Sequence, residues 1–177
     1  MKNFKRLKIS RTFVILTLLA IFILISAISY VDAVSNNISD SVFRLHVIAN
    51  SDSEEDQTLK LKVRDNLLEY MNTIAKDSTN KEEAMTIASE HKNEFIQIAE
   101  KTIRENGYEY TVNIQIGKAD FPTKYYGDIT LPAGEYDALK VEIGEAKGKN
   151  WWCVMFPPLC FVDLSTGVVP DDSKQEL

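Results

Sequence analysis

Apolar residues fill the chain from Thr12 to Val31 without a single charge, and Asp32 ends this segment. A helix of this length rises about 30 Å, which matches the hydrocarbon core of a bilayer. A buried core helix is rarely apolar all round, and it rarely stands at the end of a chain. The pattern therefore predicts a membrane-spanning or signal helix that precedes the folded part of the protein.

The pattern changes after residue 40. Residues 41–50 alternate between two faces, which predicts a β-strand. Turn and capping residues follow, and apolar residues then recur every three or four positions, which predicts a helix to about Lys76. A second helix is expected after the polar break at 77–80, and it ends at Asn106-Gly107, where glycine can take the left-handed conformation.

The second half of the chain predicts three further strands, at 108–117, 136–144 and 151–156. Between the first two, Phe121-Pro122 and Leu131–Gly134 indicate an extended aromatic loop. The order of elements is strand, helix, helix and three strands. This order predicts an α+β two-layer sandwich, in which two long helices pack on a small antiparallel or mixed sheet.

Charge places this domain outside the compartment of synthesis. Five basic residues precede the apolar segment, and such flanks stay on the cytoplasmic side: Lys2, Lys5, Arg6, Lys8 and Arg11. The rest of the chain carries 15 basic and 26 acidic residues, a net formal charge of −11. A body this acidic repels a phosphate backbone, so we expect no nucleic-acid partner.

The fate of the leader stays open between cleavage and anchoring. Small or branched residues at 27–29 and 31–33 suit a signal peptidase, whereas the apolar run is longer than the roughly 7 to 15 residues of a usual signal peptide. The expected organisation is a signal peptide or signal-anchor at 1–33, one exported domain at 34–170 and an acidic tail at 171–177.

Candidate catalytic residues are few. A nucleophile hypothesis uses Cys153 or Cys160, or Ser51 for a hydrolase, each with His46 or His91 as base. None lies in a recognised catalytic sequence context. His46 fits a strand residue on the less apolar face, and His91 fits a solvated helix residue.

A metal hypothesis is also weak, because the acidic run after His46 lacks the pattern of a calcium loop. Helix capping, by Ser51 with Glu54 or by Ser53 with Asp56, explains these residues more simply. We therefore expect no metal, no cofactor and no small-molecule substrate.

The segment from Trp151 to Val162 is the most unusual in the chain. Alternation predicts that one of the adjacent residues Trp151 and Trp152 is buried and the other exposed, as a binding hot spot or a membrane contact, although a closing core strand is the simpler interpretation. Cys153 and Cys160 flank Pro157-Pro158, and they are expected either as a disulfide or as two buried thiols.

Two segments resemble one known family. Arg44-Leu45-His46-Val47-Ile48-Ala49-Asn50-Ser51-Asp52, continued through Asp65, is similar to the opening of stage II sporulation protein R. Leu131–Tyr136 and Ile143–Asp163, with Trp151-Trp152-Cys153, are similar to its C-terminal signature. Together the two segments frame the whole predicted exported domain.

The resemblance implies a sporulation signal made in the forespore and exported into the space between forespore and mother cell. There it would activate a membrane-embedded aspartic protease of the mother-cell membrane, which cleaves the sigma-E precursor. The family offers no catalytic residue, so two residue groups remain as candidates: a structural motif of Arg44, His46, Asn50 and Asp52, and receptor contacts at Trp151, Trp152, Phe156, Pro157 and Pro158. The alternative function is an exported envelope hydrolase that uses His46, Ser51 or Cys153.

Overall fold

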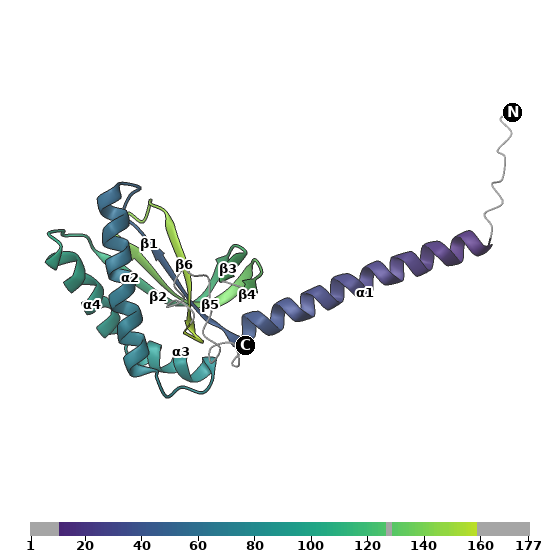
Figure 1. Ribbon diagram of the computed structural model, residues 1–177, viewed down its shortest axis with the longest axis horizontal. Helices are drawn as coiled ribbons and strands as arrows, with labels where there is room; N and C mark the ends of the chain where they lie inside the picture. Colours follow the sequence, from purple (N-terminus) through teal and green to yellow (C-terminus); the bar gives the residue numbers. More distant parts are fainter. Residues whose placement is uncertain (1–10, 127–128, 159–177) are drawn as a thin grey trace, which may run out of the picture. The chain divides into compact units, whose positions relative to one another are not determined.

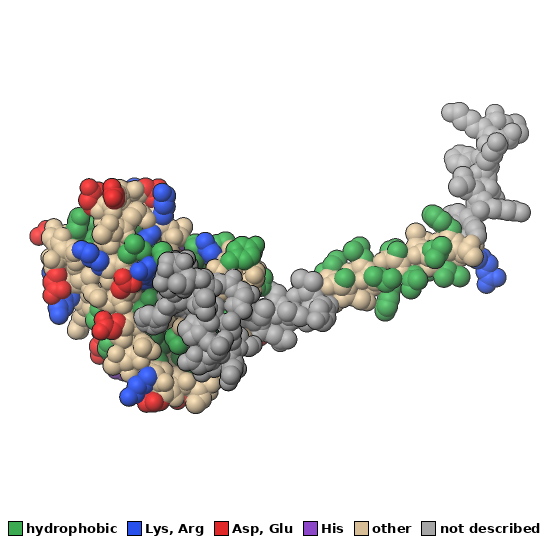
Figure 2. Space-filling view, viewed as in Figure 1, with side chains coloured by type: hydrophobic (Ala, Val, Ile, Leu, Met, Phe, Trp, Pro, Cys, Tyr) green, Lys and Arg blue, Asp and Glu red, His purple; other side chains and the backbone are tan. Residues whose placement is uncertain are grey.

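The computed structural model describes residues 11–126 and 129–158, and it begins with the long helix α1 (Arg11–Ser41). Its segment Arg11–Ser29 is long and apolar enough to cross a membrane, with a mean hydropathy of 2.7 and no part buried within the protein. Apolar side chains stand out along this segment in Figure 2. The helix does not end with the apolar run at Asp32, because backbone hydrogen bonding continues through the polar residues that follow.

The chain divides into two compact units after Asn37, and the second unit contains a mixed four-stranded sheet. Its strands are β1 (Phe43–Ile48), β2 (Val112–Phe121), β5 (Gly134–Ile143) and β6 (Asn150–Phe156), in the order β2-β5-β1-β6. β1 pairs parallel with β5 and antiparallel with β6, and β2 pairs antiparallel with β5. The predicted α+β class with a mixed sheet is confirmed.

Three helices cover one face of the sheet (Figure 1): α2 (Glu54–Ile74), α3 (Lys81–Glu90) and α4 (Lys92–Glu105). The second predicted helix is therefore interrupted at His91, which leaves the helical conformation. His91 is also not simply solvated, because its Nδ1 lies 2.8 Å from the Tyr70 hydroxyl on α2. The predicted end at Asn106-Gly107 is confirmed, with Gly107 at a φ of 85°.

The core between helices and sheet uses the faces that the periodicity predicts. Phe43, Leu45 and Val47 of β1 point into it. They meet the apolar stripes of α2 and α4, including Leu67 and Phe95. The alternation of β1 is thus confirmed, and it leaves Arg44 and His46 on the opposite face.

That opposite face is also covered, which the sequence pattern did not predict. The expected aromatic loop contains two short antiparallel strands, β3 (Lys124–Tyr126) and β4 (Ile129–Leu131). Together with residues of β2, β5 and β6 and the residue before β1, they form a second cluster of buried side chains: Val42, Phe121, Tyr126, Leu131, Tyr136, Ala138 and Val154. Figure 1 shows β3 and β4 on the side of the sheet away from the helices.

Candidate functional site

Two segments that are far apart in the sequence meet at one end of the sheet. The turn after β1 (residues 49–53) contacts the connection between β5 and β6 (residues 144–150), and we call this contact the motif clasp. Asn50 Oδ1 accepts from the Glu145 amide at 3.0 Å, and Asp52 Oδ1 accepts from the Lys149 amide at 2.7 Å. Backbone bonds from residues 147 and 148 back to Asn50 and Ala49 complete the clasp.

Asp56, in the first turn of α2, holds the clasp from the helix side. Its Oδ2 accepts from Ser51 Oγ at 2.6 Å and from Asn50 Nδ2 at 2.8 Å. Burial would raise the pKa of Asp56, but hydrogen bonds from Ser51, Asn50 and Tyr110 outweigh it and hold the pKa below its usual value. The predicted cap at Ser53 is confirmed, since its Oγ accepts from the Asp56 amide.

Two glycines allow the connection to approach the turn this closely. Gly144 has a φ of 58°, and a Cβ there would overlap the Asn50 side chain. A Cβ on Gly148 would overlap the backbone of Ser51. Asn50 and Asp52 thus hold the turn after β1 against the connection between β5 and β6.

His46 lies on the face away from the helices and is almost fully buried. Its Nε2 is 2.7 Å from Asn150 Oδ1, and its ring stacks on Trp152 with centroids 3.7 Å apart. Burial lowers the pKa of His46, against the opposing effect of the Asn150 hydrogen bond. The lowered pKa favours the neutral form of the imidazole, which packs between Trp152 and Phe121.

Arg44 is the most unusual residue of this face, because its side chain is 0% exposed. Its guanidinium carbon lies 4.0 Å from the centre of the Phe121 ring and 4.6 Å from that of Tyr136. Nη2 donates to the Tyr126 hydroxyl at 2.9 Å. Sequence reasoning placed Arg44 in a structural motif but missed its ring partners, although the aromatic density of residues 121–136 was a visible signal.

The adjacent tryptophans point to opposite faces, as strand alternation requires, but both are partly buried, so the prediction of one buried and one exposed ring is wrong. Trp151 packs on the helix side, where the Arg64 guanidinium lies 4.2 Å from its ring. Trp152 packs on the other side against His46 and Phe121.

The remaining predicted receptor contacts and the cysteines differ in how far they are buried. Phe156 and Pro157 are buried and therefore belong to the domain interior, whereas Pro158 is partly exposed. Cys153 is buried in the helix-side core and carries no free thiol. Cys160 lies outside the described residues, so the pairing of these two cysteines stays a prediction.

The hydrolase candidates are not brought together. Cys153 lies in the helix-side core and His46 on the opposite face of the sheet, so the sheet separates them. The Ser51 hydroxyl donates to Asp56, whereas the His46 ring contacts Asn150, Trp152 and Phe121. No cluster of metal-ligating side chains occurs within the described part of the chain.

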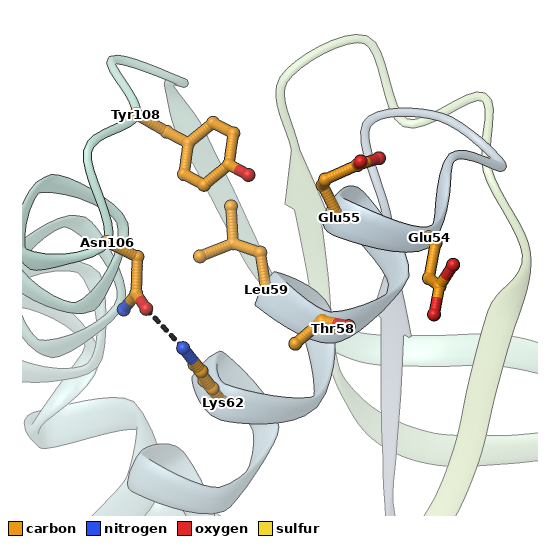
Figure 3. Close-up of a pocket in the computed structure, with 7 residues that line it drawn as sticks. All are labelled: Glu54, Glu55, Thr58, Leu59, Lys62, Asn106 and Tyr108. Atoms are coloured by element: carbon orange, nitrogen blue, oxygen red, sulfur yellow. Dashed lines mark hydrogen bonds between the residues drawn. The ribbon is translucent and has the colours of Figure 1, made fainter.

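One shallow groove lies beside the start of α2 and the end of α4 (Figure 3). Seven residues line it: Glu54, Glu55, Thr58, Leu59, Lys62, Asn106 and Tyr108. Lys62 spans it by donating to the Asn106 side chain. The charged residues Glu54, Glu55 and Lys62 are all exposed. No nucleophile among the lining residues is paired with a base, so the groove is a surface depression.

Comparisons with known proteins support the family resemblance carried by residues 44–65 and 131–163. The family model described as stage II sporulation protein R matches residues 39–166. A relative named stage II sporulation protein R, from Bacillus subtilis (strain 168), is 43% identical over 130 residues. These residues are 73% of this chain and 58% of that relative. No solved structure matches the chain. The chain therefore belongs to the stage II sporulation protein R family.

Proposed function

We propose that this protein is an exported sporulation signal that activates a membrane-embedded aspartic protease of the mother-cell membrane. Activation leads to cleavage of the sigma-E precursor. The observation that carries the proposal is the family match over residues 39–166, which includes every strand and helix of the folded unit after α1.

The N-terminal segment supports export. A basic leader precedes the apolar helix, and that order orients the following domain away from the cytoplasm. We propose that the domain lies in the space between forespore and mother cell. It is either anchored by residues 12–31 or released after cleavage of the leader.

The signal needs no chemistry of its own. A ligand activates an enzyme when it binds the active arrangement more tightly than the inactive one. A shift from 1:99 to 99:1 requires about 5.5 kcal/mol of differential binding, which a few aromatic anchors supply. We propose the partly exposed residues Trp151, Trp152 and Pro158 as contacts, because Phe156 and Pro157 face the interior.

The test is co-expression of this protein with the protease and the sigma-E precursor, followed by the size of the precursor on a gel. Two forms are compared with the full chain: one lacking residues 2–33, and one in which these residues are replaced by an unrelated cleavable signal peptide. We expect processing with the full chain and the exchanged leader, but none with the deletion, because contact occurs outside the cytoplasm.

Two results would contradict the proposal. One is an unprocessed precursor in the presence of a folded, exported protein. The other is full processing by the form without a leader, since that protein remains in the cytoplasm. His46→Ala and Ser51→Ala variants test the hydrolase alternative, which predicts that activity is lost while the fold and receptor binding persist.

A further inference from the structure

The strand β2 forms an open edge of the sheet. It is ten residues long, lies at the end of the strand order and pairs with β5 without a register shift. Within residues 11–126 and 129–158, its backbone forms hydrogen bonds to β5 alone. Proline, bulges and free lysines usually protect such an edge, but β2 has no proline, and its one lysine, Lys118, donates to Asp137 at 3.1 Å. The opposite edge strand, β6, is shorter, and its residues 153–156 are buried.

Apolar side chains beside this edge are only partly covered. Val112 and Ile116 of β2 pack on the helix-side core, yet both are partly exposed. On the neighbouring strand β5, Leu139 and Val141 face the same core and are 0% exposed. The helix layer therefore covers β5 fully and stops short of the outer side of β2. A strand added at this edge would bury the open sides of Val112 and Ile116 while it pairs with the free backbone groups.

A strip of α4 runs along the same border of the molecule. α4 packs on β2 and against α2, and it lies at the outer side of the helix layer in Figure 1. The Thr102 hydroxyl accepts from Asn66 on α2, which marks the side of α4 that faces α2. At 3.6 residues per turn, Lys92, Ile96 and Glu100 form a strip centred about 120° round the helix from Thr102. Lys92 is exposed and the other two are partly exposed, so this strip borders the open side of β2.

The strip on α4 is complementary to itself. Lys92 precedes Ile96 by one helical turn, and Glu100 follows it by one turn. When two copies of α4 meet antiparallel with Ile96 against Ile96, Lys92 of each copy lies opposite Glu100 of the other. We propose that β2 and α4 form an interface between two copies of this protein. In this interface the two β2 strands pair antiparallel, and the two α4 helices lie side by side, about one twofold axis.

The spacing of the layers allows the strands and the helices to meet at the same time. Neighbouring strands lie about 4.8 Å apart, and the axes of packed helices lie roughly 8–10 Å apart. Because α4 covers β5 and leaves the outer side of β2 open, its axis lies inward of β2. Two such helices across a β2–β2 pair are therefore about two strand spacings apart, which is the distance at which helices pack. The two four-stranded sheets become one sheet of eight strands.

The test measures the molar mass of the full-length protein in detergent micelles by analytical ultracentrifugation over a range of concentrations. We expect an equilibrium between monomer and dimer. Lys92→Glu and Glu100→Lys each place like charges opposite one another at both symmetric contacts, and each should raise the Kd of the dimer about tenfold. The variant with both substitutions restores opposite charges and should return Kd to the wild-type value. Lys101→Glu is the matched control, because it makes the same charge change on the outward side of α4, where the Lys101 side chain is 71% exposed; its Kd should be unchanged.

Crosslinking locates the strand contact. Gln115→Cys places a thiol at an exposed position of β2, near its copy across the axis, and a short bismaleimide should join the two chains. Thr73→Cys, at an exposed position of α2, is the control and should give no dimer. A wild-type protein that stays monomeric at every concentration overturns the proposal. A dimer whose Kd ignores both single charge reversals, or one that is crosslinked through Thr73→Cys and not through Gln115→Cys, overturns it as well, because the contact then lies on another surface.

Discussion

At the scale of single residues, the motif clasp explains why the two segments that carry the family resemblance are rich in Asn, Asp, Ser and Gly. Their side chains form hydrogen bonds to backbone groups that no strand or helix satisfies. Asn50, Asp52 and Gln57 of the first segment therefore stabilise the shape of the turn after β1.

The glycines of the clasp predict a sharp contrast. Gly148→Ala should lower the free energy of unfolding by about 3 kcal/mol, because the new methyl group overlaps the Ser51 backbone, which cannot move away without breaking the clasp. Gly134→Ala is the control, since its methyl group makes only an ordinary contact of 3.8 Å with Tyr136. Urea unfolding monitored by circular dichroism checks both, and equal stability of the two variants would contradict the overlap.

Asp56 predicts a pH dependence. Its pKa is depressed in the folded state by hydrogen bonds that outweigh the effect of burial, so its contribution is present above the unfolded value near 3.9 and is lost as pH falls through the folded pKa. Asp56→Asn should therefore be less stable than the wild type at pH 7, and the difference should shrink toward pH 3. A difference that is constant from pH 7 to pH 3 would show that the carboxylate charge is irrelevant.

The two tryptophans predict a difference in signalling. Because Trp151 and Trp152 lie on opposite faces of β6, only the ring on the receptor-facing side should be required for processing of the sigma-E precursor. Trp151→Ala and Trp152→Ala are each compared by precursor size on a gel, with thermal unfolding measured in parallel. If a folded, exported variant with both substitutions signals normally, neither tryptophan is an anchor for the receptor.

At the scale of elements, local residues set some of the helix boundaries and tertiary contacts set the others. The start of α2 is set locally by Ser53 and the end of α4 by Gly107. The break between α3 and α4 has no glycine or proline, and it coincides with the contact between His91 and Tyr70. Lys81, at the start of α3, pairs with Asp137 on β5 at 2.8 Å, which fixes this short helix on the sheet.

The cap of α2 predicts a modest loss on substitution. Ser53→Ala removes the acceptor for the Asp56 amide and should cost about 1 kcal/mol. Thr73→Ala is the matched control, because its hydroxyl only bonds a carbonyl of its own helix at an exposed position. Chemical denaturation of both variants at pH 7 is the measurement, and a larger effect of Thr73→Ala would contradict the assignment of the cap.

At the scale of the whole molecule, the protein combines an apolar helix with a folded unit that has cores on both faces of its sheet. In the apolar segment Arg11–Ser29 no part is buried, and Phe13, Leu19 and Phe22 are all more than half exposed. A substitution there should change localisation and leave the fold intact.

Leu19→Arg combined with Phe22→Arg tests this expectation. Each charge at the centre of an apolar helix costs roughly 3 kcal/mol of membrane insertion, so the double variant should leave the membrane fraction and lose signalling. Leu19→Ala combined with Phe22→Ala is the control, and it should still insert. Carbonate extraction of membranes reports the distribution, and retention of the arginine variant in the membrane would argue against a spanning helix.

The amino-acid pattern alone determined the features that depend on near neighbours in the chain. The apolar segment, the strand alternation of β1, the cap at Ser53 and the stop at Gly107 follow from spacing and local hydrogen bonding, so they were predictable. The α+β class also followed, because the order of elements restricts how their apolar faces can be covered.

Only the tertiary structure decided what depends on residues far apart in the sequence. It paired β1 with both β5 and β6, folded β3 and β4 over the second face, and placed Arg44 among aromatic rings whose positions are 77 to 92 residues away in the chain. It also turned two separate motifs into one clasp and separated Cys153 from His46 by the sheet. Periodicity records which face of its own element a residue occupies, but it does not record which distant element covers that face.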